Sequence, residues 1–300
     1  MKCGSQNTKK NGRFRGKEGY RCKSCGKQFV SKSRKIVTQK ILWRKFVWER
    51  QTIKQLAKQY TKSEKWIRQQ LDEVRVCKQS IQPQSVVIIA DTTFVKRTFG
   101  VCVFRSQHLQ KNLVWEICST ETADRYRELR SRLEGQGFKI QAAVIDGKPG
   151  LLEVFENIPM QMCHFHQMAI MTRYLTTRPK LPAGKELRQA ASMIPNCNEY
   201  VLEELISRWH RKWKFFLNEK TYNPETERCF YTHRRLRSAY RSINKNVSLL
   251  YTYQKYPQLN IPNTTNSLDG TFSHLKDMLR IHRGLGGVKK FKLIDEILSK

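Results

Sequence analysis

The sequence predicts an α/β protein whose main domain is built on a mixed five-stranded sheet and follows two small N-terminal regions. Two continuous apolar runs, 85–91 and 141–146, suit strands that are buried on both faces. A stretch with helical periodicity, 122–133, lies between them. The first 80 residues differ in composition, since they carry 23 basic and 5 acidic side chains. This contrast separates a basic N-terminal part from the α/β domain.

The first segment, 1–35, carries cysteines at a spacing that suits zinc. Cys22 and Cys25 form a C-x-x-C pair, and Cys3 stands 19 positions before Cys22. Zinc takes four ligands, and paired cysteines on tight turns can direct two thiolates at one ion. Only three cysteines are present, and the fourth would stand one residue before Met1, so we expect the given sequence to begin too late. The alternatives are a degenerate ribbon without metal and a solvated basic tail.

The second segment, 36–80, has the pattern of a small helical domain. Apolar residues recur at helical intervals from position 38 onward. Thr52 and Gln55 match a capping box, which predicts a second helix, and Ser63 is the predicted cap of a third helix over 64–74. Two short helices joined by a short turn are typical of a helix-turn-helix, and a plain helical hairpin is the alternative.

The third helix carries the candidate DNA-binding residues, Lys65, Arg68 and Gln69. The second helix of a helix-turn-helix enters the major groove, where arginine pairs with guanine and glutamine with adenine. The charge supports this prediction, because residues 1–80 hold +18 of the net charge of +32. A chain so basic favours a polyanionic partner.

The third segment, 81–300, supplies the sheet. We expect its strands over 85–91, 100–105, 113–119, 141–146 and 160–165. Asp91 and Asp146 end the first and fourth strands, so both carboxylates should lie at one edge of the sheet. Two divalent cations that catalyse phosphoryl transfer lie about 3.5–4 Å apart and need oxygen ligands of this kind. A strand-end aspartate that only forms a turn is the alternative for each residue.

Several motifs together resemble one protein family. They are Tyr20-x-Cys22-x-x-Cys25-Gly-Lys-x-Phe29, Ala90-Asp91-Thr92-Thr93, Ile145-Asp146-Gly147, Cys163-x-x-His166 and the run from Asn263-Thr264-Thr265-Asn266 to Lys276. Over nearly its full length the chain is similar to bacterial insertion-sequence transposases of the mutator-related group. The resemblance implies a zinc ribbon over 1–35, a helix-turn-helix over 36–80, and an RNase H-like DDE catalytic domain over 81–300 with a helical insertion at about 167–262.

The resemblance also implies the activity. Asp91 and Asp146 match the first two metal-binding acids of the family, and Asp269 occupies the place usually held by glutamate. Such an enzyme binds the terminal inverted repeats of its element and uses Mg²⁺ or Mn²⁺ to cleave and rejoin DNA. Its partners are double-stranded DNA, at the element ends and at the target, and at least a second copy of the chain. Zn²⁺ is a further cofactor if the ribbon binds metal.

Two features leave alternatives open. By resemblance His166 lies near the active site and orients the scissile phosphate or a water, but a buried Cys163 paired with His166 would serve only the fold. Asp269 is one methylene shorter than glutamate, which suits either an active all-aspartate triad or a decayed copy that only binds DNA. An RNase H-like nuclease acting on RNA or junctions would not need the helix-turn-helix.

The sequence gives no sign of a membrane segment. The longest purely aliphatic run is 86–90, and the N-terminus lacks the apolar stretch of an export signal. We therefore expect a cytoplasmic, nucleoid-associated bacterial protein. The 39% of hydrophobic residues are enough for a packed core.

Overall fold

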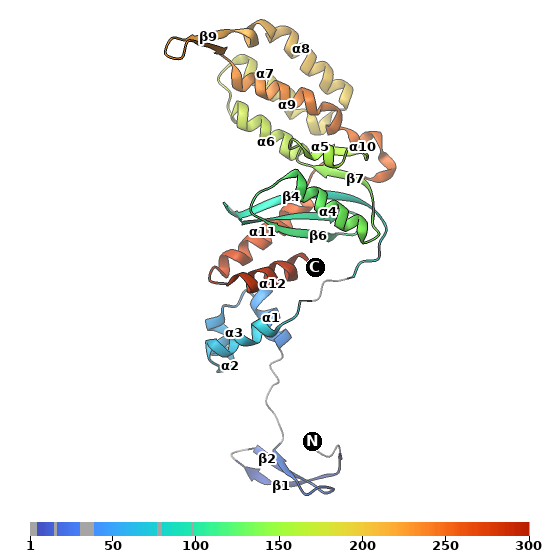
Figure 1. The fold of residues 1–300 in the computed structure, drawn as a ribbon, viewed down its shortest axis with the longest axis vertical. Coiled ribbons are helices and arrows are strands. Elements are labelled where there is room, and N and C mark those ends of the chain that lie inside the picture. Colours follow the sequence, from blue (N-terminus) through green and yellow to red (C-terminus); the bar gives the residue numbers. More distant parts are fainter. Residues whose placement is uncertain (1–4, 15–16, 31–38, 77–79, 98, 300) are drawn as a thin grey trace. The chain divides into compact units, whose positions relative to one another are not determined.

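The chain divides into two compact units, Met1–Val74 and Arg75–Lys300. The computed structural model describes residues 5–14, 17–30, 39–76, 80–97 and 99–299 (Figure 1). Cys3, one of the three predicted zinc ligands, lies outside the described residues. Each unit is described separately.

Unit 1 begins with a small antiparallel sheet of order β1-β2-β3. Its strands are β1 (Thr8–Phe14), β2 (Lys17–Cys22) and β3 (Gln28–Val30). The Cys22-x-x-Cys25 pair lies on the turn after β2, where the Gly26 N–H donates to the Cys22 carbonyl at 3.0 Å. Gly26 has φ +68°, a conformation that glycine adopts without strain. The pair therefore occupies a tight turn, while the zinc ribbon itself stays a prediction.

Three helices follow in unit 1, and their starts agree with the predicted caps. They are α1 (Gln39–Val47), α2 (Ile53–Tyr60) and α3 (Glu64–Glu73). The capping box is present, since Gln55 N donates to Thr52 Oγ1 at 3.3 Å and Thr52 N donates to Gln55 Oε1 at 2.8 Å. Ser63 Oγ accepts from Trp66 N at 3.2 Å. Fully buried side chains from all three helices form the core: Leu42, Phe46, Leu56, Ile67 and Leu71.

Unit 2 contains the predicted mixed five-stranded sheet, in the order β6-β5-β4-β7-β8. The strands are β4 (Ser85–Lys96), β5 (Phe99–Ser106), β6 (Lys111–Cys118), β7 (Lys139–Ile145) and β8 (Met160–Met162). The pairs β4–β5 and β5–β6 are antiparallel, whereas β4–β7 and β7–β8 are parallel. The α/β class and the five strands are thus confirmed.

Two predicted strand ends are wrong. β4 continues to Lys96, because its antiparallel pairing with β5 extends over Ile88–Lys96, and Asp91 therefore lies inside the strand rather than at its end. β8 ends at Met162, because the Cys163 carbonyl already accepts from Gln167 N at 3.0 Å in the first turn of the next helix.

Helices cover both faces of this sheet. On one face α4 (Ala123–Gly135) and the short α5 (Leu151–Val154) share a core with the even-numbered residues of β4. Since side chains alternate along a strand, the odd-numbered residues face the other side. There α11 (Asn266–Ile281) packs on β4, and α12 (Gly287–Leu298) reaches β6 through the Trp115 indole N–H, which donates to Asp295 Oδ1 at 2.8 Å.

A separate helical core occupies 164–259, seen beyond the sheet in Figure 1. Its elements are α6 (His164–Leu175), α7 (Pro182–Ser192), η1 (Ile194–Asn196), α8 (Glu199–Asn218), α9 (Arg234–Leu250), α10 (Thr252–Lys255) and η2 (Pro257–Leu259). A hairpin that the sequence did not predict, β9 (Lys220–Asn223) with β10 (Arg228–Tyr231), interrupts the helices.

The aromatic side chains of this region mostly pack its own core. Trp209 is buried in this core, and the partly buried Trp213 and Phe216 pack against the core. Phe215, in contrast, is 77% exposed. Among the residues that the structure describes, no helix is long and apolar enough to cross a membrane.

Candidate active site

The register of two parallel strands brings Asp91 and Asp146 to the same level of the sheet. The last parallel pair of β4 and β7 joins Ile89 to Val144. Asp91 follows Ile89 by two residues, and Asp146 follows Val144 by two residues. Parallel strands advance at equal rates, so the two carboxylates lie on neighbouring strands just beyond the point where the pairing ends.

The turn after β7 fixes Asp146. Its Oδ1 accepts from the Lys148 backbone N–H at 2.9 Å. Gly147 between them has φ +74°, and a Cβ at this position would lie 2.1 Å from the Met162 sulfur. A larger residue would be strained by this conformation and would displace the Met162 side chain, so glycine suits this turn beside the Asp146 carboxylate.

Burial perturbs both carboxyl groups. Asp91 is 8% exposed, and its Oδ1 accepts from the Thr92 N–H at 2.8 Å. Burial raises the pKa of Asp91 to about 7; the nearby Asp146 and Glu121 add to the shift, and His166 opposes it. Burial likewise raises the pKa of Asp146, with Glu121 adding to it and His166 and Lys148 opposing it. Such groups are strongly stabilised by a cation.

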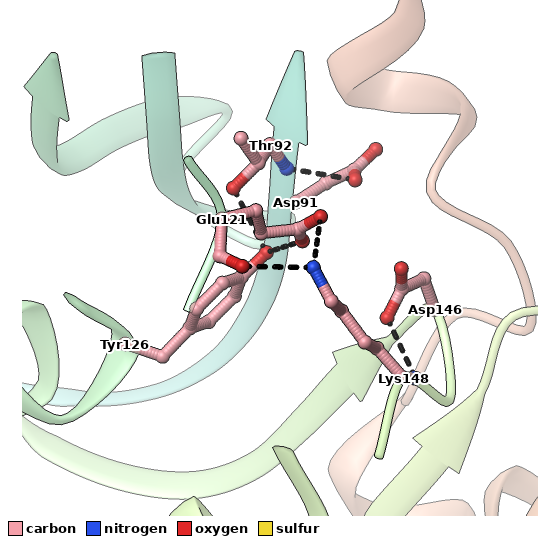
Figure 2. A network of polar contacts seen from close by, with 6 residues as sticks. All are labelled: Asp91, Thr92, Glu121, Tyr126, Asp146 and Lys148. Atoms are coloured by element: carbon pink, nitrogen blue, oxygen red, sulfur yellow. Dashed lines mark hydrogen bonds and ion pairs between the residues drawn. The ribbon is translucent and has the colours of Figure 1, made fainter. Parts of the chain in front are cut away.

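Glu121 is a further acid of the site that the sequence did not predict. Figure 2 shows Lys148 extending from the Asp146 turn to Glu121, where its Nζ donates to Oε2 and to the backbone oxygen, both at 2.9 Å. Tyr126 O–H donates to Glu121 Oε1 at 2.7 Å, and Tyr126 lies 3.0 Å from the Thr92 hydroxyl. This network ties the segment after β6 to β4 and β7.

A topological signal could have revealed Glu121. β6 is antiparallel to β5, which is antiparallel to β4, so β6 runs parallel to β4. The C-terminal end of the third strand therefore lies at the same edge of the sheet as the two aspartates. Glu121 falls between the predicted strand 113–119 and the predicted helix 122–133, so no motif drew attention to this acid.

Two neighbouring cavities contain the predicted catalytic residues. One, of about 360 Å³, is lined by Asp91, Asp269 and His166. The other, of about 420 Å³, is lined by Asp146, Glu121 and again His166. His166 thus lines both cavities, together with the buried Asp91 in one and the partly buried Asp146 in the other, and the structure brings all four predicted catalytic residues to one place.

Asp269 reaches the site from a helix, α11, rather than from the sheet. It lies in the first turn of α11 and is exposed, unlike Asp91. The segment before α11 is held against the start of α6, since His164 N donates to the Asn263 carbonyl at 2.9 Å and Cys163 Sγ lies 3.5 Å from Thr265 Oγ1. Two motifs about a hundred residues apart are therefore in contact.

His166 is the cationic group of this cluster. The neighbouring Cys163 thiol, together with Asp91 and Asp146, raises the pKa of His166 to about 9 against the opposing effect of burial. Burial acts to raise the pKa of Cys163, but His166 and Thr265 outweigh it and lower that pKa. His166 is therefore protonated at neutral pH. Its Nδ1 is buried without a hydrogen-bond partner in the described part of the chain.

The donor set fits a hard divalent cation. Across the described residues, no three His, Cys, Asp or Glu side chains form a ready-made metal cluster. The acids nevertheless offer only oxygen donors, which magnesium and manganese prefer. The buried Asp91 and the partly buried Asp146 both have raised pKa values, so a cation between them would offset their desolvation. Asp91, Asp146 and Asp269 are the residues that could hold it.

The predicted DNA-binding side chains lie on one exposed surface of α3 in unit 1. Lys65, Arg68 and Gln69 are all exposed, whereas Ile67 and Leu71 between them are buried. Arg68 and Gln69 make only surface contacts within the helix, to Glu64 at 3.4 Å and to Glu73 at 3.2 Å. Both side chains are free to exchange these contacts for a ligand.

Neither the protein-family models nor the curated proteins compared with this chain give a match. The function is therefore argued from the residues and their geometry.

Proposed function

We propose that this chain is a DDE-type transposase, which binds the terminal inverted repeats of an insertion sequence and catalyses metal-dependent DNA cleavage and strand transfer. The observation that carries the proposal is the placement of Asp91 and Asp146 at one level of neighbouring parallel strands, with Asp269 lining the same cavity as Asp91. The sheet order β6-β5-β4-β7-β8, with its first three strands antiparallel, supports an RNase H-like fold for this domain.

The three aspartates would hold Mg²⁺ or Mn²⁺. The bound cation would polarise a phosphoryl oxygen and lower the pKa of water. The protein contributes the geometry: hydrogen bonds from backbone N–H groups fix one oxygen each of Asp91 and Asp146. Asp269, on a different element, can adjust to the bound phosphate because its side chain is exposed.

His166 has the properties of a phosphate-binding group. It is protonated at neutral pH, it lines both cavities, and its buried Nδ1 has no partner among the described residues. A charged imidazole N–H donated to a phosphate oxygen is a strong hydrogen bond in a buried site. His166 would therefore orient the scissile phosphate between Asp91 and Asp146.

Unit 1 would supply sequence recognition. The helices α2 and α3 are joined by residues 61–63, and α3 presents Arg68 and Gln69 to solvent. These side chains suit guanine and adenine in the major groove. Because the two ends of an element must be held together, the active complex would contain at least two chains.

The proposal is tested by incubating the purified chain with labelled duplexes that carry the DNA flanking its gene. Binding is measured in EDTA, and nicking is then measured in Mg²⁺ or Mn²⁺ for the wild type, Asp146→Asn and the exposed control Asp124→Asn. We expect specific binding by all three proteins and metal-dependent nicking by the wild type and the control only. Specific binding without nicking by any of them would instead indicate a DNA-binding protein that has lost catalysis.

A further inference from the structure

A further cavity of unit 2, of about 370 Å³, is lined by cations that the catalytic proposal does not use. Its charged lining residues come from three parts of the fold: Lys96, Lys276, Arg280, Arg283 and Lys290. The rest of the lining is apolar, with Phe99 below the Lys290 ammonium group at 4.8 Å from the ring centre. Among the described residues that line it, none is a carboxylate. We call this cavity the cationic pocket.

The charge of the cationic pocket is largely uncompensated. Within the described part of the chain, Lys96, Lys276 and Arg283 have no ion pair, and Arg280 pairs with Asp277 at 2.9 Å on the surface. Like charges gathered in one cavity repel each other, so an arrangement of this kind is stabilised by a bound polyanion.

The cationic pocket lies next to the candidate active site. Lys276 lines both this pocket and the cavity that holds Asp91 and Asp269. Asp269, Lys276 and Arg280 are separated by seven and four residues, which places them on one face of α11. A row of side chains thus leads along the helix from a carboxylate to the cations.

The distance from the candidate active site to the cationic pocket is the same along α11 and along β4. Along α11, Asp269 and Arg280 are about 16 Å apart at the rise of an α-helix. Along β4, Asp91 and Lys96 are also about 16 Å apart at the rise of a strand. This separation corresponds to about five base pairs of length along the axis of a duplex.

We propose that the cationic pocket binds the phosphate backbone of the DNA that enters the candidate active site. This inference rests on the proposed function, because it takes the substrate of Asp91 and Asp269 to be DNA. The phosphates of a DNA strand are regularly spaced. They suit a row of cations from β4, α11 and α12 that begins on the same face of α11 as Asp269. Lys96 and Arg283 hold the backbone by charge and read no bases.

The test compares two double variants. One removes two positive charges from the cationic pocket, and the other removes two positive charges from elsewhere on the surface. Lys96→Gln/Arg283→Gln changes two exposed residues on different elements. Arg241→Gln/Lys245→Gln on α9 removes the same charge from exposed positions outside the pocket. Fluorescence anisotropy with a labelled duplex in EDTA, over a series of salt concentrations, gives the dissociation constant and its salt dependence for each full-length protein.

The logarithm of the binding constant falls as the logarithm of the salt concentration rises, and each phosphate contact contributes about 0.9 to the steepness of this slope. We therefore expect the slope of the pocket variant to be less steep than that of the wild type by about 1.8. The control variant should keep the wild-type slope. Equal slopes in the pocket variant and the wild type, or equal losses in both variants, would overturn the proposal. Slope loss in the pocket variant without metal-dependent nicking by the wild type would support the pocket and refute the catalytic function. Metal-dependent nicking by the wild type, with the same slope in the pocket variant and the wild type, would support the catalytic function and refute the pocket.

Discussion

The two sides of the candidate active site are built differently. On the sheet side, Asp91 and Asp146 are held by strand register, by backbone N–H groups and by a network that includes Glu121. On the helix side, Asp269 is exposed in the first turn of α11 and lies at the edge of a cavity. The two carboxylates on the sheet side are fixed by hydrogen bonds and have raised pKa values. The Asp269 side chain on the helix side is exposed and can change its rotamer.

This difference explains why an aspartate at position 269 is compatible with catalysis. The shorter side chain must reach the same cavity as Asp91, and an exposed residue at a helix start can do so through small rotations of its side chain. A buried residue within β4 has no such freedom, because its surroundings are closely packed. The same substitution should therefore act differently on the two sides.

The largest expected effect comes from exchanging aspartate for glutamate at each position. Asp91→Glu should lower the rate of metal-dependent nicking by at least about 100-fold, since displacing a reacting group by about 1 Å has effects of this size. Asp269→Glu should keep or raise the wild-type rate. Nicking of labelled duplexes by the two variants measures both. Equal losses would show that the two sides are equally constrained.

The second expected effect is on stability and concerns the raised pKa of Asp91. Its folded value of about 7 exceeds the ordinary value of 3.8, so the native state holds an extra proton between these pH values. Stability should fall as pH rises through this window, by up to about 4 kcal/mol in total.

Urea unfolding at pH 4.5 and pH 8 in EDTA checks this prediction. Asp91→Asn should lose much of this pH dependence and be more stable than the wild type at pH 8. Asp269→Asn, an exposed change, should shift the unfolding free energy by less than about 0.5 kcal/mol. If Asp91→Asn showed the wild-type pH dependence, burial of this carboxyl would not be a source of strain.

The smallest expected effect concerns the network behind the sheet side. Tyr126→Phe removes the O–H that donates to Glu121 and leaves a part-buried oxygen without that partner, which should cost about 1–2 kcal/mol of unfolding free energy. Tyr200→Phe is the control, because Tyr200 is 75% exposed. A cost no greater than that of the control would mean that Glu121 is held by Lys148 alone.

The sequence predicted the parts of this fold that local patterns determine. The starts of α2 and α3 followed from Thr52 and Ser63, since a cap acts within one helical turn. The five strands followed from their apolar runs. The extent of β4 beyond Asp91 did not, because pairing with β5 carries the strand through the polar residues Thr92 and Thr93.

The candidate site was predicted in outline only. Asp91 and Asp146 stood out because each ends an apolar run, and Asp269 and His166 came from the family motifs. Glu121 was missed because its position depends on the direction of β6, which no local pattern records. The cationic pocket was missed for a similar reason, since Lys96, Arg283 and Lys290 meet only when α11 and α12 pack beside β4.

The most direct test of the central claim is calorimetric titration of the full-length chain with Mn²⁺ at pH 8. The wild type and the control Asp124→Asn/Asp277→Asn should bind the cation with the same affinity. Asp91→Asn/Asp146→Asn should bind it at least about 10-fold more weakly, since each change removes a charged oxygen donor. Equal Mn²⁺ affinity in all three proteins would contradict the claim that Asp91 of β4 and Asp146 of the β7 turn form a metal site.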